Sequence, residues 1–289
     1  MYCCLKNGRI VAGMPGVVKD FKLVKILYSS IPYGGLIGEE KYFPRFMEEM
    51  KKLQGIAQFR MIPSPGMDYP FQAKRIDTIC TLIDLQNMNE ERLFARYNHY
   101  LRRDIRRADR YGIKIRKATS IDDLSAFYAM YLNSMERNRA VAKYSFEWVE
   151  AVSSKGVILF AEMRDIVVAG ILLVHSGKTT HAMIAGSDSR YLKFFPNKLL
   201  IHHALLEAVS CESGTFDFGG SSPDDRELIR FKEQFGGKSI KLTTYIIDLE
   251  PLKCWLWEKG RRIMSTGIGA NILRKVRGRP VLENSVFMR

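Results

Sequence analysis

The chain has 289 residues, of which 46% are hydrophobic, and it carries a net charge of +14. This length and composition fit a globular protein with one large core or two modest ones, and they exclude a low-complexity or extensively disordered chain. No apolar run reaches the roughly 20 residues that a membrane-spanning helix needs, and the first residues lack the basic and apolar regions of a secretory signal. We therefore expect a cytoplasmic protein.

The first third of the chain predicts a small unit of strands with one helix. A hairpin is expected around Asn7 and Gly8, because an Asn-Gly pair tolerates the positive φ angles of a tight turn. The spacing of the apolar residues then predicts a strand at 22–28, a helix at 41–53, and strands at 56–61 and 78–84.

A single helix is predicted from Asn89, its N-cap, to Tyr111, where Gly112 ends it. On a helical projection its arginines fall within about 100° of arc, beside an apolar face. They are Arg92, Arg96, Arg103, Arg106, Arg107 and Arg110. Two interpretations stay open: a solvated basic face on a helix that packs on the core, and a surface that binds the phosphates of a substrate or an RNA.

Residues 113–248 predict a longer alternation of strands and helices. Strands are expected at 113–117, 157–163, 166–174, 178–185, 215–218 and 239–247, and helices at 121–133, 144–152, 196–211 and 224–235. The resulting order, β-α-α-β-β-β-α-β-α-β, predicts an α/β (α+β) fold with a mixed central sheet flanked by helices. It is the element order of the GNAT acyltransferase fold.

The charge excess lies in two segments. Residues 91–117 hold ten Lys and Arg against three Asp and Glu, and residues 251–289 hold nine against two, so each carries +7. We expect an anionic partner for them: a phosphate-bearing substrate, an RNA or a membrane surface. In the C-terminal segment, Trp255 and Trp257 stand among basic residues. This pattern suits peripheral contact with the inner face of an anionic membrane, contact with RNA, or docking on the segment's own domain.

Three segments carry a family resemblance. They are Leu101–Ile115 with its run of arginines, Thr215–Gly220 (Thr-Phe-Asp-Phe-Gly-Gly), and Arg230–Gly237 (Arg-Phe-Lys-Glu-Gln-Phe-Gly-Gly). The first resembles a basic helix that runs through a glycine into a strand, the second a strand ending in Asp-Phe-Gly-Gly, and the third a Phe-Lys-x-x-Phe-Gly-Gly signature. Through them the chain resembles the FemAB-like acyltransferases (peptidoglycan interpeptide-bridge or BioF2-like enzymes) of the GNAT superfamily.

The resemblance implies two GNAT-like halves, of which the second is complete and the first is truncated at its N-terminus. The expected limits are 1–88 for the truncated half, 89–112 for a basic connecting helix, 113–248 for the complete half and 249–289 for a basic amphipathic C-terminal segment. The first half is the weaker part of this prediction, because it rests on element order alone.

The implied activity is transfer of an activated acyl group, taken from an aminoacyl-tRNA, to an amine acceptor such as a phosphorylated cell-envelope precursor. No tightly bound cofactor is implied. An acyl thioester such as acyl-CoA, used in polysaccharide or lipid assembly, is the alternative donor. Residues 188–198 contain no glycine, so they lack the loop that brings backbone N–H groups to a coenzyme A pyrophosphate. A non-catalytic RNA-binding module of GNAT fold is a third possibility.

The resemblance makes Lys232 the leading chemical residue, for oxyanion stabilisation or for contact with the end of a tRNA; a solvated helix lysine is the alternative. Asp217 is a candidate to orient the amine, or else to cap a turn. The strand end at Gly186 is expected to offer backbone N–H groups to the acyl carbonyl. Phe231 suits core packing or stacking on a base, and Gly219 and Gly220 suit the turn or the substrate cleft.

For the acceptor, the resemblance singles out Arg137, followed by Asn138, as a binding site for phosphate groups. Asn197 and Tyr33 are further candidates for lining the same cleft, although Tyr33 also suits a plain turn. The phosphate-binding candidates on the basic helix are Arg96, Arg103, Arg106, Arg107 and Arg110.

No metal site is expected from the sequence. The five cysteines are scattered without a CxxC pair, and the histidines lack ligand spacing. His175 and His181 could meet across a hairpin, but no cysteine or carboxylate pair completes a zinc site. Reduced thiols in a cytosolic protein fit this pattern best.

Overall fold

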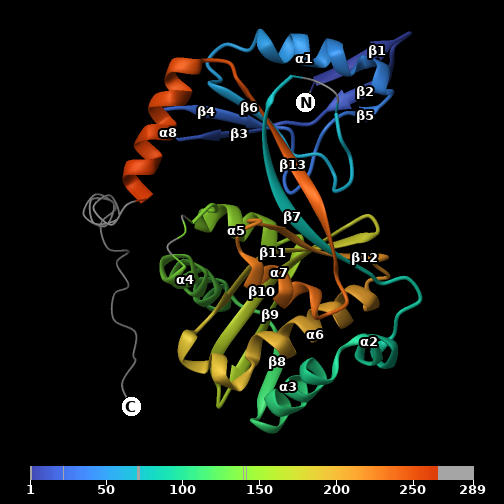
Figure 1. The fold of residues 1–289 in the computed structure, drawn as a ribbon, viewed down its shortest axis with the longest axis vertical. Coiled ribbons are helices and arrows are strands. Elements are labelled where there is room, and N and C mark those ends of the chain that lie inside the picture. The colour runs from blue at the N-terminus through green and yellow to red at the C-terminus, as the bar shows by residue number, and fades with distance from the viewer. Residues whose placement is uncertain (1, 22, 70–71, 139, 141, 266–289) are drawn as a thin grey trace. The chain divides into compact units, whose positions relative to one another are not determined.

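The computed structural model describes residues 2–21, 23–69, 72–138, 140 and 142–265 (Figure 1). The chain forms two compact units. Unit 1 joins residues 1–61 with residues 245–289, and unit 2 holds residues 62–244. Strand β7 therefore belongs to unit 2, although the sequence grouped it with the first 88 residues. The division into two GNAT-like halves stays a prediction.

Unit 1 contains the predicted hairpin and helix. Asn7 (φ 50°) and Gly8 (φ 74°) form its turn, as expected. The elements are β1 Tyr2–Lys6, β2 Arg9–Met14, β3 Val17–Asp20, β4 Lys25–Tyr28, β5 Ile37–Gly38, η1 Glu40–Tyr42, α1 Phe43–Lys51, β6 Gln58–Met61 and α8 Pro251–Ser265. Strands β1, β2 and β5 form one sheet. A second sheet runs β3, β4, β6 and the end of β13, whose residues Tyr245–Asp248 pair with β6.

Helix α8 packs on this second sheet through Cys254 and Trp257. Cys254 is 3% exposed, and its Sγ lies 3.0 Å from the carbonyl oxygen of Ala57. Leu252, Trp255 and Leu256 of the same helix are exposed. Residues 266–289 of the C-terminal segment lie outside the described residues. Within the described chain, no helix combines the length and hydropathy required to cross a membrane.

Unit 2 is built on a mixed sheet in the order β13, β7, β12, β11, β10, β9, β8. From β7 to β8 all neighbours are antiparallel except β11 and β12, which are parallel. The sheet holds all the strands predicted after residue 112. Its strands are β7 Lys74–Asp84, β8 Ile113–Lys117, β9 Gly156–Met163, β10 Ile166–Ser176, β11 Thr179–Ser187, β12 Thr215–Ser221 and β13 Lys238–Asp248.

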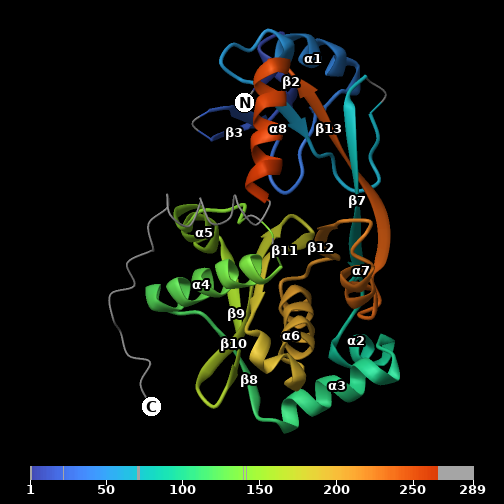
Figure 2. The ribbon, with the colours of Figure 1, turned by 60° about the vertical axis from the view of Figure 1, so that its left-hand side comes forward.

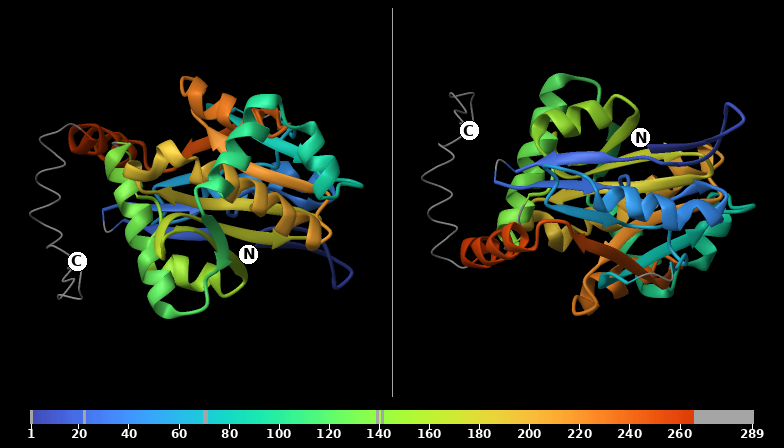
Figure 3. Two further views of the ribbon diagram at one scale, coloured as in Figure 1. Left: turned by 90° about the horizontal axis from the view of Figure 1, so that it is seen from below. Right: turned by 90° about the horizontal axis from the view of Figure 1, so that it is seen from above.

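Helices cover both faces of this sheet (Figure 2, Figure 3). One core cluster joins α2, α3 and α6 to the sheet, and a second joins α4 and α5 to the other face. On that other face a Cβ at Gly170 would lie 2.9 Å from the ring of Phe127, so the glycine lets α4 approach β10 closely. The helices are α2 Glu90–Arg96, α3 His99–Arg110, α4 Ile121–Arg137, α5 Phe146–Ser153, α6 Pro196–Ser210 and α7 Arg226–Glu233.

The prediction of one long helix from Asn89 to Tyr111 is wrong, because this segment forms two helices, α2 and α3. Tyr97 leaves the helical conformation (ψ 143°), and the side chain of Asn98 caps the second helix by accepting from the Leu101 N–H at 2.8 Å. The break is fixed by packing, because Tyr97 is 2% exposed and meets Phe235 edge to face. The arginines are therefore divided between α2 and α3.

Candidate active site

Strands β11 and β12 run side by side for three residue pairs and then separate. The last pair is His181 with Asp217, after which β11 continues to Ser187 and β12 to Ser221 without further pairing between them. Each separating strand still has its other neighbour, β10 or β7. The two strands thus part at a fixed point in the middle of the sheet.

Each strand bulges just past this point. Ala182 and Ile184 of β11 lie opposite the consecutive residues Leu173 and Leu172 of β10, so Met183 is an extra residue. A bulge interrupts the ladder and bends the strand. It therefore steers the end of β11 away from the line of β12.

The bulge in β12 involves a glycine. Asp217 and Gly220 lie opposite Leu82 and Cys80 of β7, which leaves one extra residue between them. Gly219 has φ 70°, which a residue with a side chain adopts at a cost. Its N–H donates to Oδ1 of Asp217 at 2.7 Å. The motif Asp-Phe-Gly-Gly therefore forms the bulge that opens the sheet.

His181 and Asp217 form a pair at this point. Nδ1 of His181 lies 2.8 Å from Oδ2 of Asp217, and the two side chains are 12% and 2% exposed. The Cys80 thiol lies 3.2 Å from the other carboxylate oxygen. Because an ionised carboxylate only accepts hydrogen bonds, Nδ1 of His181 is the donor in this pair, and Asp217 orients the imidazole. Such a histidine is suited to act as a general base.

Lys232 is buried beneath the β12 bulge rather than exposed on its helix. Its Nζ donates to the carbonyl oxygens of Phe218 and Gly219, both at 3.0 Å, and to Oγ of Ser221 at 2.8 Å. Burial lowers the pKa of Lys232 to about 8, although nearby Asp217 acts in the opposite direction. All three donors of the ammonium meet protein acceptors, so the lysine holds the separated end of β12 in place.

A second group of polar residues converges at the far end of β11, on Ser187. Nη1 of Arg137 donates to the carbonyl oxygen of Ser187 at 2.7 Å, and Nδ2 of Asn197 lies 3.4 Å from its Oγ. Ser134 exchanges hydrogen bonds with the backbone of the same serine. The structure therefore brings together Arg137 and Asn197, which were predicted for one cleft.

Other predicted residues take simpler places. Asn138 is the exposed C-cap of α4, and a Cβ at Gly186 would lie 3.1 Å from the backbone of Met130 in α4. Phe231 packs beside the core, with its ring 5.5 Å from that of Phe235. Tyr33 lies in unit 1, and its role in substrate binding stays a prediction.

The arginines of the basic helices differ in what they contact. Arg96 donates to the carbonyl oxygens of Asp84 (2.8 Å) and Gly236 (3.4 Å), so it ties α2 to the chain around it. Arg103 pairs with buried Asp104. The three others are Arg106 over the ring of Phe94, Arg107 over the ring of Phe195, and the exposed Arg110.

The start of α6 differs from a glycine-rich anion-binding turn. Pro196 at the first helical position has no N–H, and Phe195 before it is left-handed (φ 62°). Arg107 and Lys198 both lie over the Phe195 ring, at 5.1 and 5.5 Å. An aromatic ring flanked by two cations therefore stands where a glycine-rich turn would present backbone N–H groups.

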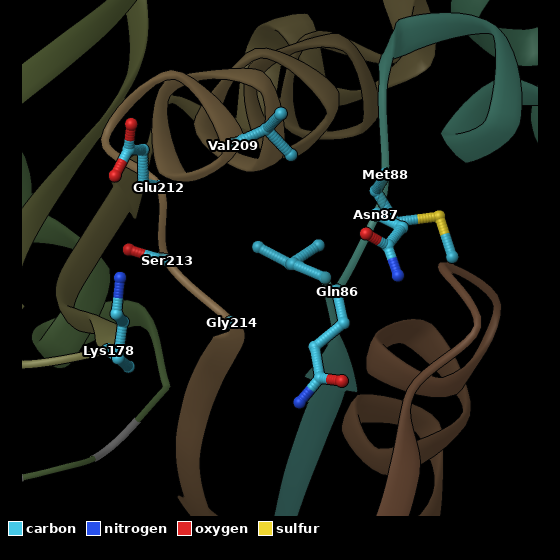
Figure 4. A pocket seen from close by; sticks show the side chains of 9 residues that line it. Gln86, Asn87, Met88, Lys178, Val209, Glu212, Ser213 and Gly214 are labelled. Atoms are coloured by element: carbon cyan, nitrogen blue, oxygen red, sulfur yellow. The ribbon is translucent and has the colours of Figure 1, made fainter.

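A cavity of about 490 Å³ lies elsewhere in unit 2, at the opposite end of β12 from the bulge. Figure 4 shows Lys178, Glu212 and Ser213 on one side of it and Gln86 and Asn87 on the other. It contains neither His181 nor Asp217. The parted strands, rather than this cavity, bring together the groups suited to acyl transfer.

His181 was not predicted from the sequence as a partner of Asp217. The two residues are 36 positions apart, and only the register of the parallel strands places them side by side. Alternation along β11 offered a signal, since Thr180 and Ala182 face the core on one side and His181 faces the other. The partner could not be chosen without the strand pairing.

Comparisons with known proteins agree with this architecture. Residues 95–233 match the family model described as "Acetyltransferase (GNAT) domain". No curated protein matched the sequence.

Two solved structures resemble the chain in fold. FemX is 13% identical with a TM-score of 0.62, over 86% of this chain and 88% of that one. L-PGS from Bacillus licheniformis is 13% identical with a TM-score of 0.56, over 80% of each chain. The predicted resemblance is confirmed: residues 95–233 resemble a GNAT acetyltransferase domain, and the fold of the chain is similar to that of FemX.

Proposed function

We propose that the protein is an acyltransferase that moves an aminoacyl group from an aminoacyl-tRNA to an amine acceptor. The observation that carries the proposal is the parting of β11 and β12 at the His181–Asp217 pair. Parted strands leave backbone N–H groups without ladder partners, and such groups suit the oxygen of a reacting carbonyl. The imidazole at the point of parting supplies a base within the same opening.

The reaction needs no covalent enzyme intermediate. The nitrogen lone pair of the acceptor attacks the carbonyl carbon of the donor ester, and Nε2 of His181 takes the proton that the nitrogen loses. The bond between the acyl carbon and the ribose oxygen then breaks, and the ribose oxygen takes the proton from Nε2 of His181 as it leaves. Asp217 keeps the imidazole oriented and stabilises its charged form in between, while Lys232 keeps the strand end in position.

A tRNA donor is supported by the start of α6 and by α3 beside it. The residues there do not form an anion-binding helix terminus, because Pro196 and Phe195 replace the glycine-rich turn. Arg107 lies over Phe195, and Tyr111 at the end of α3 contacts Phe194. A basic helix next to the exposed ring of Tyr111 and the half-buried rings of Phe194 and Phe195 suits a nucleic acid that carries both phosphates and bases.

For the acceptor, the group around Ser187 supports an amine that carries an anionic part. Arg137 is exposed and is anchored by Ser187 through Nη1 and Nη2, so its guanidinium supplies a fixed positive charge for the anionic part of an acceptor. Acceptors of a cell-envelope precursor class would satisfy this chemistry through their phosphates. Peripheral contact of the C-terminal segment with an anionic membrane is part of the same proposal, and the exposed Leu252, Trp255 and Leu256 support it.

A second candidate is an N-acyltransferase with a thioester donor. The match of residues 95–233 to an acetyltransferase domain favours it. Against it stands the start of α6, where Phe195 and Pro196 replace the glycine-rich turn whose N–H groups would bind a pyrophosphate.

The test is a transfer assay on the full chain with two donors. Bulk tRNA charged with labelled amino acids and labelled acetyl-CoA are each incubated with the protein and a panel of amines and envelope precursors, and products are read by mass spectrometry. Product from charged tRNA alone is the expected result. Product from acetyl-CoA alone overturns the tRNA donor, and tRNA binding with no product under either donor overturns the enzyme in favour of an RNA-binding module. His181→Gln serves as the catalytic control.

A further inference from the structure

A second polar cluster lies in unit 2, on the opposite face of the sheet from the His181–Asp217 pair. It brings together His175 at the end of β10 with Glu207 and Cys211, which stand one turn apart at the end of α6. Their ligand atoms lie within 4.8 Å of one another. None of these residues takes part in the proposed acyl transfer.

The two softest donors already have the separation that a metal ion requires. Nε2 of His175 lies 3.6 Å from Sγ of Cys211. A tetrahedral zinc ion with Zn–N of about 2.0–2.1 Å and Zn–S of about 2.3 Å holds its N and S ligands about 3.6 Å apart. An ion can therefore be placed between them with little movement of either side chain.

The histidine is held in the orientation that a metal ligand needs. Its Nδ1 lies 2.8 Å from Oγ1 of Thr180, which lies 2.6 Å from Oγ of Ser213. Thr180 is fully buried. A partner on one ring nitrogen fixes the tautomer and directs the other nitrogen at the ion, as is usual for histidine ligands.

Glu207 supplies the third ligand and brings a counter-charge with it. Its Oε1 accepts from Nζ of Lys117 at 2.7 Å, and a carboxylate has a second oxygen available for an ion. As zinc ligands, a cysteine thiolate and a carboxylate bring two negative charges to a divalent ion. The site thus favours a divalent cation.

We propose that His175, Glu207 and Cys211 bind a zinc ion, with water in the fourth position. A mixed N, S and O set with tetrahedral geometry favours zinc over magnesium or calcium, which prefer oxygen ligands alone. Cys211 is exposed and the other two ligands are half-buried, so the ion is accessible from solvent. The ion would cross-link the hairpin of β10 and β11 to the end of α6. This inference departs from the expectation, drawn from sequence spacing, that the chain has no metal site.

The site is independent of the acyl-transfer chemistry. Thr180 and His181 are neighbours on β11, so their side chains point to opposite faces of the sheet. Thr180 contacts His175, whereas His181 contacts Asp217. Loss of the ion is therefore expected to affect stability more than the chemical step.

The experiment is a titration of the chelator-treated, reduced full chain with Co²⁺, followed by displacement with Zn²⁺. Tetrahedral Co²⁺ bound to a thiolate gives intense d–d bands and a thiolate-to-metal charge-transfer band, which report the ligand set directly. We expect these bands at one ion per chain, and their loss on addition of Zn²⁺. Zn²⁺ should also raise the Tm of the wild type, since an ion that binds only the folded state stabilises it.

Matched variants assign the ligands. Cys211→Ser should remove the charge-transfer band, and His175→Gln or Glu207→Gln should weaken binding by more than tenfold. Thr180→Val should weaken it by roughly 10-fold to 100-fold, as loss of a second-shell partner does. Cys3→Ser, which removes another exposed thiol, should leave the spectrum unchanged. The proposal is overturned if wild type gives no tetrahedral spectrum, or if Cys211→Ser retains the charge-transfer band.

Discussion

Nδ1 of His181 lies 2.8 Å from Oδ2 of Asp217, and these two residues are also the last backbone pair between β11 and β12. The pair is therefore fixed on one side by the ladder and on the other by two bulges. A general base placed in this way does not depend on a flexible loop for its orientation. The structure positions it before any substrate arrives.

Replacing the base should reduce the chemical step. We expect His181→Gln to lower kcat by about 10²–10⁴-fold with little change in KM, since general-base catalysis contributes an effect of that size. Asp217→Asn should lower kcat as well, because a neutral amide does not stabilise the charged imidazole and its NH2 group can favour the wrong tautomer. Single-turnover rates with saturating donor are the measurement.

A double variant separates this role from simple loss of structure. His181→Gln combined with Asp217→Asn should cost much less than the product of the two single effects, because the residues act as a unit. His99→Gln, at an exposed histidine, is the matched control. Equal rates for wild type and His181→Gln would remove the assignment of the base.

Removing Lys232 should destabilise the fold and do so in a pH-dependent way. Lys232→Met leaves the carbonyl oxygens of Phe218 and Gly219 without their donor, which costs roughly 1–3 kcal/mol per buried unsatisfied group. The pKa of Lys232 is lowered to about 8 from 10.5, so between these pH values the unfolded chain binds more protons than the folded one. Wild-type stability should therefore rise relative to the variant from pH 8 to 10.

Urea unfolding of both proteins at pH 7, 8, 9 and 10 measures this difference. Lys232→Arg is a useful comparison, since it keeps a cation that does not deprotonate in this range. A stability difference between wild type and Lys232→Met that is constant across the series would contradict the role given to the buried ammonium.

Acid should weaken the core of unit 2 through a histidine in α6. Burial, with a smaller contribution from His203, lowers the pKa of His202 to about 4 from 6.5. The folded state therefore resists protonation, and its stability is lost as pH falls from 6.5 towards 4. The loss should reach about 2 kcal/mol by pH 5. Wild type should lose this stability in urea unfolding between pH 7 and pH 5, whereas His202→Phe should lose less.

The basic surface of α3 should control nucleic-acid affinity. We expect Arg107→Ala combined with Arg110→Ala to weaken tRNA binding and to reduce the slope of log K against log salt by about 1.5, since each phosphate contact contributes about 0.7–0.9. Filter binding of tRNA from 50 to 200 mM salt, about the range over which such contacts show, is the measurement. Lys155→Ala combined with Lys178→Ala removes the same charge elsewhere, and an equal effect from that pair would show a non-specific cause.

Most elements of unit 2 were predictable because they depend on local patterns. The strand Ile113–Lys117 has the predicted bounds, and α6 begins at Pro196 as predicted, since alternation and a proline at the first helical position are local signals. The break at Tyr97 was not predictable in this way. It is set by contacts with His202 and Phe235, which are more than 100 residues away, and local spacing favoured a continuous helix.

The candidate site was predictable in part. The Asp-Phe-Gly-Gly and Phe-Lys segments pointed to Asp217 and Lys232, and the structure brings them together. Their partners depend on strand register, which places His181 beside Asp217, and on the bulge, which turns two carbonyl oxygens towards Lys232. A lysine in a helix is ordinarily expected to be exposed to solvent, and only the three-dimensional packing shows that Lys232 is buried.

Unit 1 is built from the two ends of the chain, and this affects the order in which the protein folds during synthesis. Residues 1–61 complete their sheet only with Tyr245–Asp248, so they must wait on the ribosome until the intervening polypeptide has emerged. Residues 62–244 are contiguous, and all their strands except β13 have been synthesised by residue 221. The N-terminal residues are thus expected to complete their sheet only near the end of synthesis, although they are translated first.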